Sequence, residues 1–394
     1  MQCFGSAADL VRERSPERPV LCLRPHAASR AAAWFRSNFP GTVVYALKAN
    51  TAPEIVDALG AAGIDHFDVG SMPEVELASR ISGARLFYMN PVKPRSAIAR
   101  AYSEFGVSHF ALDSEAELEK ILAATRNAKD LVLFVRIACP NRHSVIPLEG
   151  KFGIAADEAD DLLMKARQAA AELGITFHIG SQAMRPEGFS EALALAERAI
   201  RGAGVLVDKI DVGGGFPSRY AGAEPPPLEA YMAEIKSFLR RLPVGRRCEM
   251  ICEPGRALVA EAESVLVRVD ARRGDHLYIN DGAFGTLFDA ARSGITYPAR
   301  AVQMRSGEPP DLQPFSLFGP TCDSNDHMPG PYLLPGDIEE GDYVEIGQIG
   351  AYGRVLATGF NGFGNYDEAV LLDEPIATMY PEAPASADAR AVGE

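Results

Sequence analysis

The stretch Val43-Val44-Tyr45-Ala46-Leu47-Lys48-Ala49-Asn50 decides how the fold of this chain is interpreted. Four of its first five residues are β-branched or large and apolar, which is typical of a buried strand in a parallel sheet. A lysine stands where this strand should end, and a helical pattern follows from Pro53 to Leu59. We therefore expect a strand and a helix with Lys48 between them.

Two interpretations of Lys48 are possible. A lysine at the mouth of an apolar strand meets little water, so desolvation favours its neutral amine. A neutral amine can attack an aldehyde and form a Schiff base. In the alternative, the side chain simply extends its charge from the strand end into solvent. The second interpretation is the commoner one for an isolated lysine, but the rest of the chain favours the first.

Composition bounds the class of protein. The chain has 394 residues, is 47% hydrophobic and 23% charged, and is long enough for two domains. Its net charge of −14 would repel nucleic acid and anionic membranes, so we expect neither as a partner. The six cysteines lack paired metal-site spacing, and no metal is expected. Because neither a signal peptide nor a membrane-spanning run is recognisable, we expect a cytoplasmic protein with free thiols.

Apolar runs like the first recur along the chain, each followed by an Ala- and Glu-rich helical stretch. The eight expected strands are 43–47, 66–70, 86–89, 109–112, 131–137, 175–180, 209–213 and 249–252. The expected helices include Pro73–Arg80, Ser114–Ala124, Ala156–Leu173, Phe189–Gly202 and Leu228–Leu242. This alternation predicts a (β/α)8 barrel. The alternative is a doubly wound open sheet, but this sequence has no GxGxxG motif after its first predicted strand.

The pattern changes from about Val265. Short apolar runs punctuated by Gly and Pro, such as SVLVRV and YVEIGQIGAYG, predict a separate, antiparallel β domain. The segment VLCL at 20–23 is a candidate to join it. We expect the tail 381–394 to be disordered.

The ends of the predicted barrel strands carry functional groups, as the active sites of such barrels require. In chain order these are Lys48, Asp68, Asn90, Asp113, Arg136, His178 with Ser181, Gly213-Gly214-Gly215, and Glu253 with Gly255 and Arg256. Singly each has a structural explanation, since Asp113 and Asp68 could be helix N-caps. Together they predict one site at the barrel mouth.

Three features of this site indicate pyridoxal phosphate. Three consecutive glycines let backbone N–H groups surround a phosphate, to which Ser181 and Arg256 could add a hydroxyl and a cation. Lys48 suits the aldehyde, and the flat ring of His178 could lie on an aromatic cofactor. A carboxylate such as Glu253 at the pyridine nitrogen keeps it protonated and favours decarboxylation, whereas an arginine there suits racemisation.

Motifs along the chain resemble one family. They are YALKAN, FDVGSMPEVELA, FYMNPVK, HFALDSEAELEKI, VRIA, KFGI, FHIGSQ, DVGGGFP, CEPGR, DGAFG, GPTCDSND, GAYG and FNGF. In this order, from about residue 20 to 372, they resemble the eukaryotic-type ornithine and diaminopimelate decarboxylases. These are pyridoxal-phosphate enzymes built on an alanine-racemase-like barrel, and FHIGSQ and GPTCDSND are most similar to the ornithine/lysine branch.

The resemblance implies a barrel at 25–262, a β-sandwich or barrel-like domain from 1–24 plus 263–380, and a head-to-tail homodimer. It implies that Lys48 is the Schiff-base lysine, that His178 stacks on the ring and that Glu253 meets its nitrogen. It assigns the remaining cofactor contacts to Asp68, Arg136, Ser181, Gly213, Gly214, Gly215, Gly255, Arg256 and Tyr352. It also implies that the partner completes each site: Cys322 handles the proton returned to Cα, and Asp323, with Phe360 nearby, meets the substrate.

One departure from the family concerns the substrate tail. Where ornithine enzymes carry a second acid for the distal amine, this chain has Arg292 or Ser293. An arginine would repel an ammonium and welcome a carboxylate, unless it points to solvent or Asp289 supplies the acid. Because the motifs are most similar to the ornithine/lysine branch, we still expect decarboxylation of ornithine or lysine. The alternatives are a related decarboxylase for an acid- or amide-tailed amino acid, and a non-catalytic protein that binds pyridoxal phosphate.

Overall fold

The computed structural model describes residues 1–241, 248–304 and 310–381. Eight strands close into a barrel in the order β11-β12-β3-β4-β5-β6-β7-β9, and all neighbouring pairs run parallel. They are β3 (Thr42–Ala46), β4 (His66–Val69), β5 (Arg85–Tyr88), β6 (His109–Leu112), β7 (Val132–Arg136), β9 (Glu172–Thr176), β11 (Lys209–Asp211) and β12 (Glu249–Cys252). The predicted barrel is confirmed.

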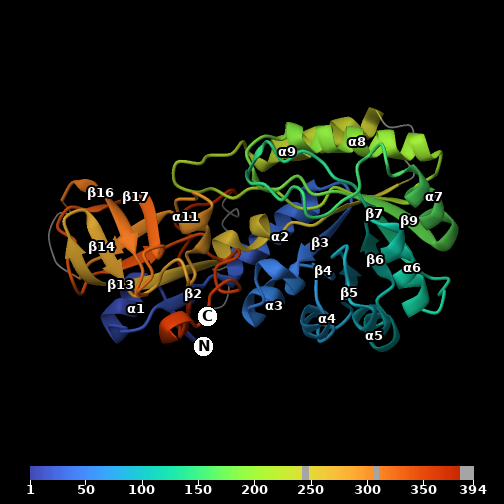
Figure 1. The fold of residues 1–394 in the computed structure, drawn as a ribbon. Coiled ribbons are helices and arrows are strands. Elements are labelled where there is room, and N and C mark those ends of the chain that lie inside the picture. Colours follow the sequence, from blue (N-terminus) through green and yellow to red (C-terminus); the bar gives the residue numbers. More distant parts are fainter. Residues whose placement is uncertain (242–247, 305–309, 382–394) are drawn as a thin grey trace, which may run out of the picture.

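Helices alternate with these strands and lie on the outside of the barrel (Figure 1). They are α2 (Pro25–Asn38), α3 (Pro53–Ala61), α4 (Met72–Ala78), α5 (Arg95–Phe105), α6 (Glu115–Ala124), α7 (Asp160–Ala169), α8 (Glu187–Ala203), α9 (Leu228–Arg241) and the short α10 (Arg256–Val259). The strands β8 (Ser144–Ile146) and β10 (Ser181–Ala183) form a separate two-stranded antiparallel sheet.

The strand β3 (Thr42–Ala46) is apolar along most of its length because both of its faces are covered. In β3, Val44 contributes to a cluster inside the barrel with Phe87, Phe134 and Ile251. Its neighbours Val43 and Tyr45 belong instead to the large cluster that includes the surrounding helices. Because successive side chains of a strand point to opposite faces, a strand covered on both faces needs apolar residues at every position.

The second unit is a mostly antiparallel sheet, on the left of Figure 1, built from both ends of the chain. Its strands are β1 (Gln2–Phe4), β2 (Val20–Leu23), β13 (Glu263–Arg273), β14 (His276–Ile279), β15 (Ala299–Val302), β16 (Leu312–Phe318), β17 (His327–Pro335), β18 (Tyr343–Ile346) and β19 (Asp367–Leu371). The segment 20–23 is β2, which pairs antiparallel with β13 and parallel with β19. Helix α1 (Ala7–Arg14) packs with this sheet.

Some predicted elements differ from the structure. The sixth barrel strand is Glu172–Thr176 rather than 175–180, because α7 ends at Ala169 and the chain turns into the sheet earlier. A five-residue helix, α11 (Phe288–Arg292), stands where only β structure was expected. The sheet also contains the parallel pairs β1–β19, β19–β2 and β14–β16. The predicted disordered tail, 381–394, lies outside the described residues apart from Pro381.

Within the described ranges, no helix combines the length and the apolar character needed to cross a membrane. The same ranges contain no group of three or more His, Cys, Asp or Glu side chains placed to hold a metal ion.

Candidate active site

Lys48 and Asp68 form the centre of the site. Lys48 lies on the short 3-10 turn η1 (Leu47–Ala49) that follows β3, and Asp68 lies in the neighbouring strand β4. The parallel register places Ala46 opposite Asp68, so the lysine two residues on reaches across to the carboxylate. Nζ of Lys48 is 2.6 Å from Oδ2 of Asp68. The two adjacent strand ends thus bring an amine and an acid into direct contact.

The charge of Lys48 differs from the sequence expectation. Burial lowers the pKa of the Lys48 amine, but Asp68, with Tyr352 and Glu253, outweighs it and raises the pKa above its ordinary value. The expectation that desolvation would favour the neutral amine is therefore wrong for this arrangement. The raised pKa favours the charged form of Lys48, whose Nζ donates to Oδ2 of Asp68.

A cavity of about 470 Å³ opens over this pair. Its wall is formed by Lys48, Asp68, Gly70, Met89, Asn90, Arg136, Pro147, Leu148, Glu149, Lys151, Phe152, His178, Ser181, Glu253 and Tyr352. The structure therefore brings together seven of the predicted cofactor residues: Lys48, Asp68, Arg136, His178, Ser181, Glu253 and Tyr352. Asp113 plays another part, accepting the N–H of Gly153 at 2.9 Å, while Ser114 caps α6.

Glu253 supplies a buried carboxyl group with an unsatisfied atom. Its Oε1 is buried and has no hydrogen-bond partner among the described residues. Burial, with the nearby carboxylates of Asp211 and Asp68, raises the pKa of Glu253 well above its ordinary value. A buried polar atom without a partner is costly, and Glu253 is part of the cavity wall, so a ligand there could supply the missing hydrogen bond.

The three glycines 213–215 allow a very close backbone approach after β11, but none of them is part of the cavity wall. Gly213 and Gly215 have positive φ angles, 65° and 105°. A Cβ atom at Gly213 would lie 2.0 Å from the carbonyl oxygen of Phe177, and one at Gly214 would lie 2.8 Å from that of Glu253. No other residue type fits this turn, and the anion cradle expected here stays a prediction.

Arg256 connects this region to Ser181 and two tyrosines. Its Nε donates to Ser181 Oγ at 3.1 Å, and its Nη1 donates to the hydroxyl of Tyr220 at 2.7 Å. The guanidinium also lies 5.1 Å from the ring centroid of Tyr352. Arg256 therefore reaches the cavity through Ser181 and Tyr352, both of which line it. Tyr220 was missed in the sequence, because no motif marks a contact between residues 36 positions apart.

His178 presents a neutral ring to the cavity. Burial, then the charges of Arg136 and Lys48, lower its pKa to about 3. Its Nδ1 accepts the backbone N–H of Gly180 at 3.1 Å, which fixes the ring's orientation. A neutral, oriented imidazole suits a stacking role better than proton transfer at physiological pH.

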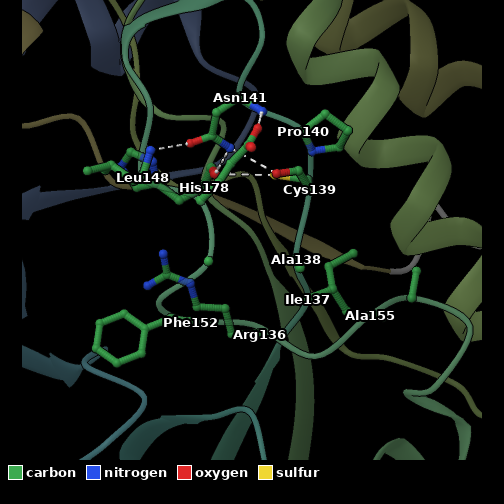
Figure 2. A pocket seen from close by; sticks show the side chains of 13 residues that line it. Arg136, Ile137, Ala138, Cys139, Pro140, Asn141, Leu148, Phe152, Ala155 and His178 are labelled. Atoms are coloured by element: carbon green, nitrogen blue, oxygen red, sulfur yellow. Dashed lines mark hydrogen bonds between the residues drawn. The ribbon is translucent and has the colours of Figure 1, made fainter.

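A second cavity, of about 400 Å³ (Figure 2), shares five wall residues with the first: Arg136, Leu148, Glu149, Phe152 and His178. Asn141 organises its wall by donating to the carbonyl oxygens of Cys139 and His178 at 2.9 and 3.2 Å, and by accepting the N–H of Leu148. The loop between β7 and α7 is thereby fastened to the segment that carries His178. Sequence analysis missed Asn141, which stands in no motif.

The predicted substrate residues lie elsewhere. Asp289 is buried on α11, where its Oδ2 accepts from Arg256 Nη2 at 2.8 Å, and Ser293 hydrogen-bonds the same carboxylate. Arg292 is exposed. Cys322 and Asp323 lie on the loop between β16 and β17, and Phe360 packs against Phe284. Asn325 and then Arg292 lower the pKa of Asp323. None of these predicted residues is part of the 470 Å³ cavity wall in the single chain.

Comparisons with known proteins agree on one family. The family described as "Pyridoxal-dependent decarboxylase, pyridoxal binding domain" matches residues 26–260. The lysine/ornithine decarboxylase of Selenomonas ruminantium is 32% identical over 343 residues, which cover 84% of each chain. The ornithine decarboxylase of Mus musculus is 30% identical over 372 residues, covering 87% of this chain and 78% of the relative.

Solved structures show the same fold. The lysine decarboxylase of Selenomonas ruminantium superimposes with a TM-score of 0.80 at 30% identity, covering 93% of this chain and 96% of the other. The lysine/ornithine decarboxylase of Vibrio vulnificus, complexed with putrescine, has a TM-score of 0.79 at 28% identity, covering 94% and 99%.

Proposed function

The chain belongs to the pyridoxal-dependent decarboxylases, and on this premise we propose that it removes the α-carboxylate of a basic amino acid, ornithine or lysine. The observation that carries the proposal is a single cavity whose wall contains Lys48, paired with Asp68, and Glu253, whose buried Oε1 has no hydrogen-bond partner in the described part of the chain. The amine of Lys48 could bind the aldehyde of pyridoxal phosphate, with Asp68 beside it to accept a proton. The free oxygen of Glu253 could meet the ring nitrogen. Relatives that act on ornithine and lysine support the substrate class.

The residues present fit the cofactor. Lys48 would hold its aldehyde carbon, and the unpartnered Oε1 of Glu253 would meet its ring nitrogen. The glycine turn 213–215, with Ser181, Arg256 and Tyr352, would hold its phosphate, and Gly255, the N-cap of α10, would lie beside them. His178 would lie against its ring. When bound, the cofactor acts as an electron sink for the carbanion left as CO2 departs.

Individual side chains would share the proton movements. Asp68 would take the proton of Lys48 when the amine becomes neutral, because the two atoms are already hydrogen-bonded. Glu253 has a raised pKa and would keep a proton near the ring nitrogen. Arg136, whose guanidinium lies 5.5 Å from the ring centroid of Phe152, would support the cavity wall beside His178.

The distal part of the site would come from a second copy of the chain. Cys322 is exposed and Asp323 is partly exposed on one loop, and neither lines the cavity of its own protomer. In a head-to-tail homodimer this loop would close the partner's cavity, with Asp323 meeting the substrate's amine and Cys322 returning a proton to Cα. Phe360 would lie at the same interface. Each site would then need both protomers.

A second candidate substrate is an amino acid with an acidic or amide tail. Asp289 accepts from Arg256, which supports a role other than that of the family's second acid, and Arg292 is exposed beside it on α11. If Arg292 faces the substrate tail, a carboxylate would bind there better than an ammonium ion.

Three further assignments belong to this proposal. We place the barrel at 25–262 and the β domain at 1–24 plus 263–380, and we place the protein in the cytoplasm. There its six cysteines, all unpaired, would remain reduced.

The deciding experiment measures CO2 release from a panel of amino acids. The panel holds ornithine, lysine, arginine, diaminopimelate, glutamate and glutamine in both stereochemical forms where they exist. Release from ornithine or lysine, and its loss in Lys48→Ala, is the expected result. Release from glutamate or glutamine alone would establish the second candidate, and no release from any member would overturn the proposal.

A further inference from the structure

Glu263 lies where the chain passes from the barrel to the β domain, at the first residue of β13. Its side chain is completely buried. A buried carboxylate is stable only when hydrogen bonds and an opposite charge compensate for lost water. The hydrogen-bond partners of Glu263 therefore indicate which parts of the structure its charge stabilises.

The two oxygens of Glu263 hold two different turns. Oε1 accepts from Arg354, with Nη2 at 2.6 Å and Nε at 3.0 Å. Oε2 accepts from Nδ2 of Asn50 at 2.7 Å. Asn50 follows Lys48 by two positions, and Arg354 follows Tyr352 by two positions. One carboxylate thus binds both segments that deliver cofactor residues from opposite domains.

The same two segments also touch each other directly. The N–H of Tyr352 donates to the carbonyl oxygen of Ala49 at 2.9 Å, and Nδ2 of Asn50 donates to that of Gly350 at 2.8 Å. Tyr352 has a φ of 63°, which is unfavourable for a residue with a side chain. Such a conformation persists only where surrounding contacts impose it. Glu263 supplies the charged centre of those contacts.

We propose that Glu263 is a positioning residue that fixes Lys48 relative to Tyr352 and so prepares the cavity for the cofactor. Glu263 itself does not line the cavity and acts through Asn50 and Arg354. The inference rests on the proposed function, because it assigns cofactor contacts to Lys48 and Tyr352. It predicts that cofactor affinity depends on a carboxylate that the cofactor never touches.

The test is Glu263→Gln, which keeps the shape and removes the charge. The dissociation constant of pyridoxal phosphate, measured by absorbance titration of the cofactor-free protein, should rise by about tenfold or more. The thermal midpoint of the cofactor-free protein serves as the measure of structural damage. The matched control is Glu368→Gln, because Glu368 is the other acid on Arg354 and lies at the surface, 2.9 Å from Nη1. It should leave the dissociation constant within about twofold.

Each outcome supports or overturns the positioning role of Glu263. Equal loss of thermal stability with and without cofactor, and an unchanged dissociation constant in Glu263→Gln, would overturn the inference and leave Glu263 a structural residue. If Glu263→Gln does not fold, Arg354→Gln tests the same link, since Arg354 is partly exposed. An unchanged dissociation constant there overturns the inference as well. Wild-type protein that binds no cofactor would instead overturn the proposed function.

Discussion

Arg256 and Asp289 form an ion pair, Nη2 to Oδ2 2.8 Å, in which both side chains are buried. The pair links the short helix α10, which follows the last barrel strand, to α11 in the β domain. It joins the arginine proposed for the cofactor's phosphate to the helix that carries Arg292. Asp289 is thus occupied in holding Arg256.

Removing the charge of Asp289 should destabilise the cofactor-free protein more than the loaded protein. In Asp289→Asn, Arg256 is left buried without its anion, a loss of about 3 kcal/mol or more in comparable buried pairs. A bound phosphate would replace part of that missing charge. Urea unfolding with and without pyridoxal phosphate measures the difference. Equal losses in the two forms would separate Arg256 from the phosphate.

Lys48 should be the covalent attachment point of the cofactor. Borohydride treatment of the loaded wild type should fix the cofactor to the chain, and Lys48→Ala should abolish this adduct. Lys151→Ala is the matched control, because Lys151 is the other lysine of the cavity wall, and it should retain the adduct. Mass spectrometry of the digested protein locates the modified residue. An adduct that survives in Lys48→Ala would place the attachment elsewhere.

If two protomers share each site, mixing two inactive variants should restore part of the activity. Lys48→Ala and Cys322→Ala should each be impaired, but in a random mixture half of the dimers would combine one of each. Each mixed dimer would contain one site with both residues intact. Activity should therefore recover to about a quarter of wild type. A mixture no more active than its components would argue against a cavity completed by the partner.

Arg292→Asp should raise activity on ornithine and lysine relative to acidic amino acids if Arg292 lines the tail pocket. The change replaces a charge that repels an ammonium with one that attracts it, a difference expected to exceed about tenfold in kcat/KM. Arg185→Asp, a change of the same charge on the barrel side, controls for net charge. An unchanged ranking of substrates would place Arg292 outside the pocket.

His178 should make the cofactor-free protein sensitive to acid. Its pKa is lowered to about 3 by burial and by Arg136 and Lys48, while an unfolded histidine keeps its ordinary value near 6.5. Between these values the unfolded chain binds the proton and the folded chain does not, so stability falls as pH falls from 6.5. His178→Gln should flatten this part of the stability curve, measured by urea unfolding.

The barrel could be predicted because its information is local. Runs such as Val43–Leu47 are apolar at every position, and a strand covered on both faces demands this. Their alternation with helical stretches and the polar group at each strand end place Lys48, Asp68, Arg136 and His178 at one mouth. The structure gathers these four around one cavity.

Other features were not predictable, because they depend on charges brought together from distant parts of the chain. Lys48 was expected to be neutral, and the contact with Asp68 reverses that. The ion pair between Asp289 and Arg256 joins residues 33 positions apart, and no motif announced it. Helix α11 is five residues long, too short for its periodicity to be recognised.

The amino-acid sequence alone determined the alternation of strands and helices in the barrel, the residues at the barrel strand ends and the cofactor that their chemistry suits. Only the tertiary structure decided which charges neutralise one another, that Glu253 keeps an unpartnered oxygen, and that Glu263 joins the turns of Lys48 and Tyr352. The physical reason is how far apart in the sequence the interacting residues stand. Backbone pattern is set by neighbours a few residues apart, whereas the state of a charge depends on every group that folding brings within a few ångströms.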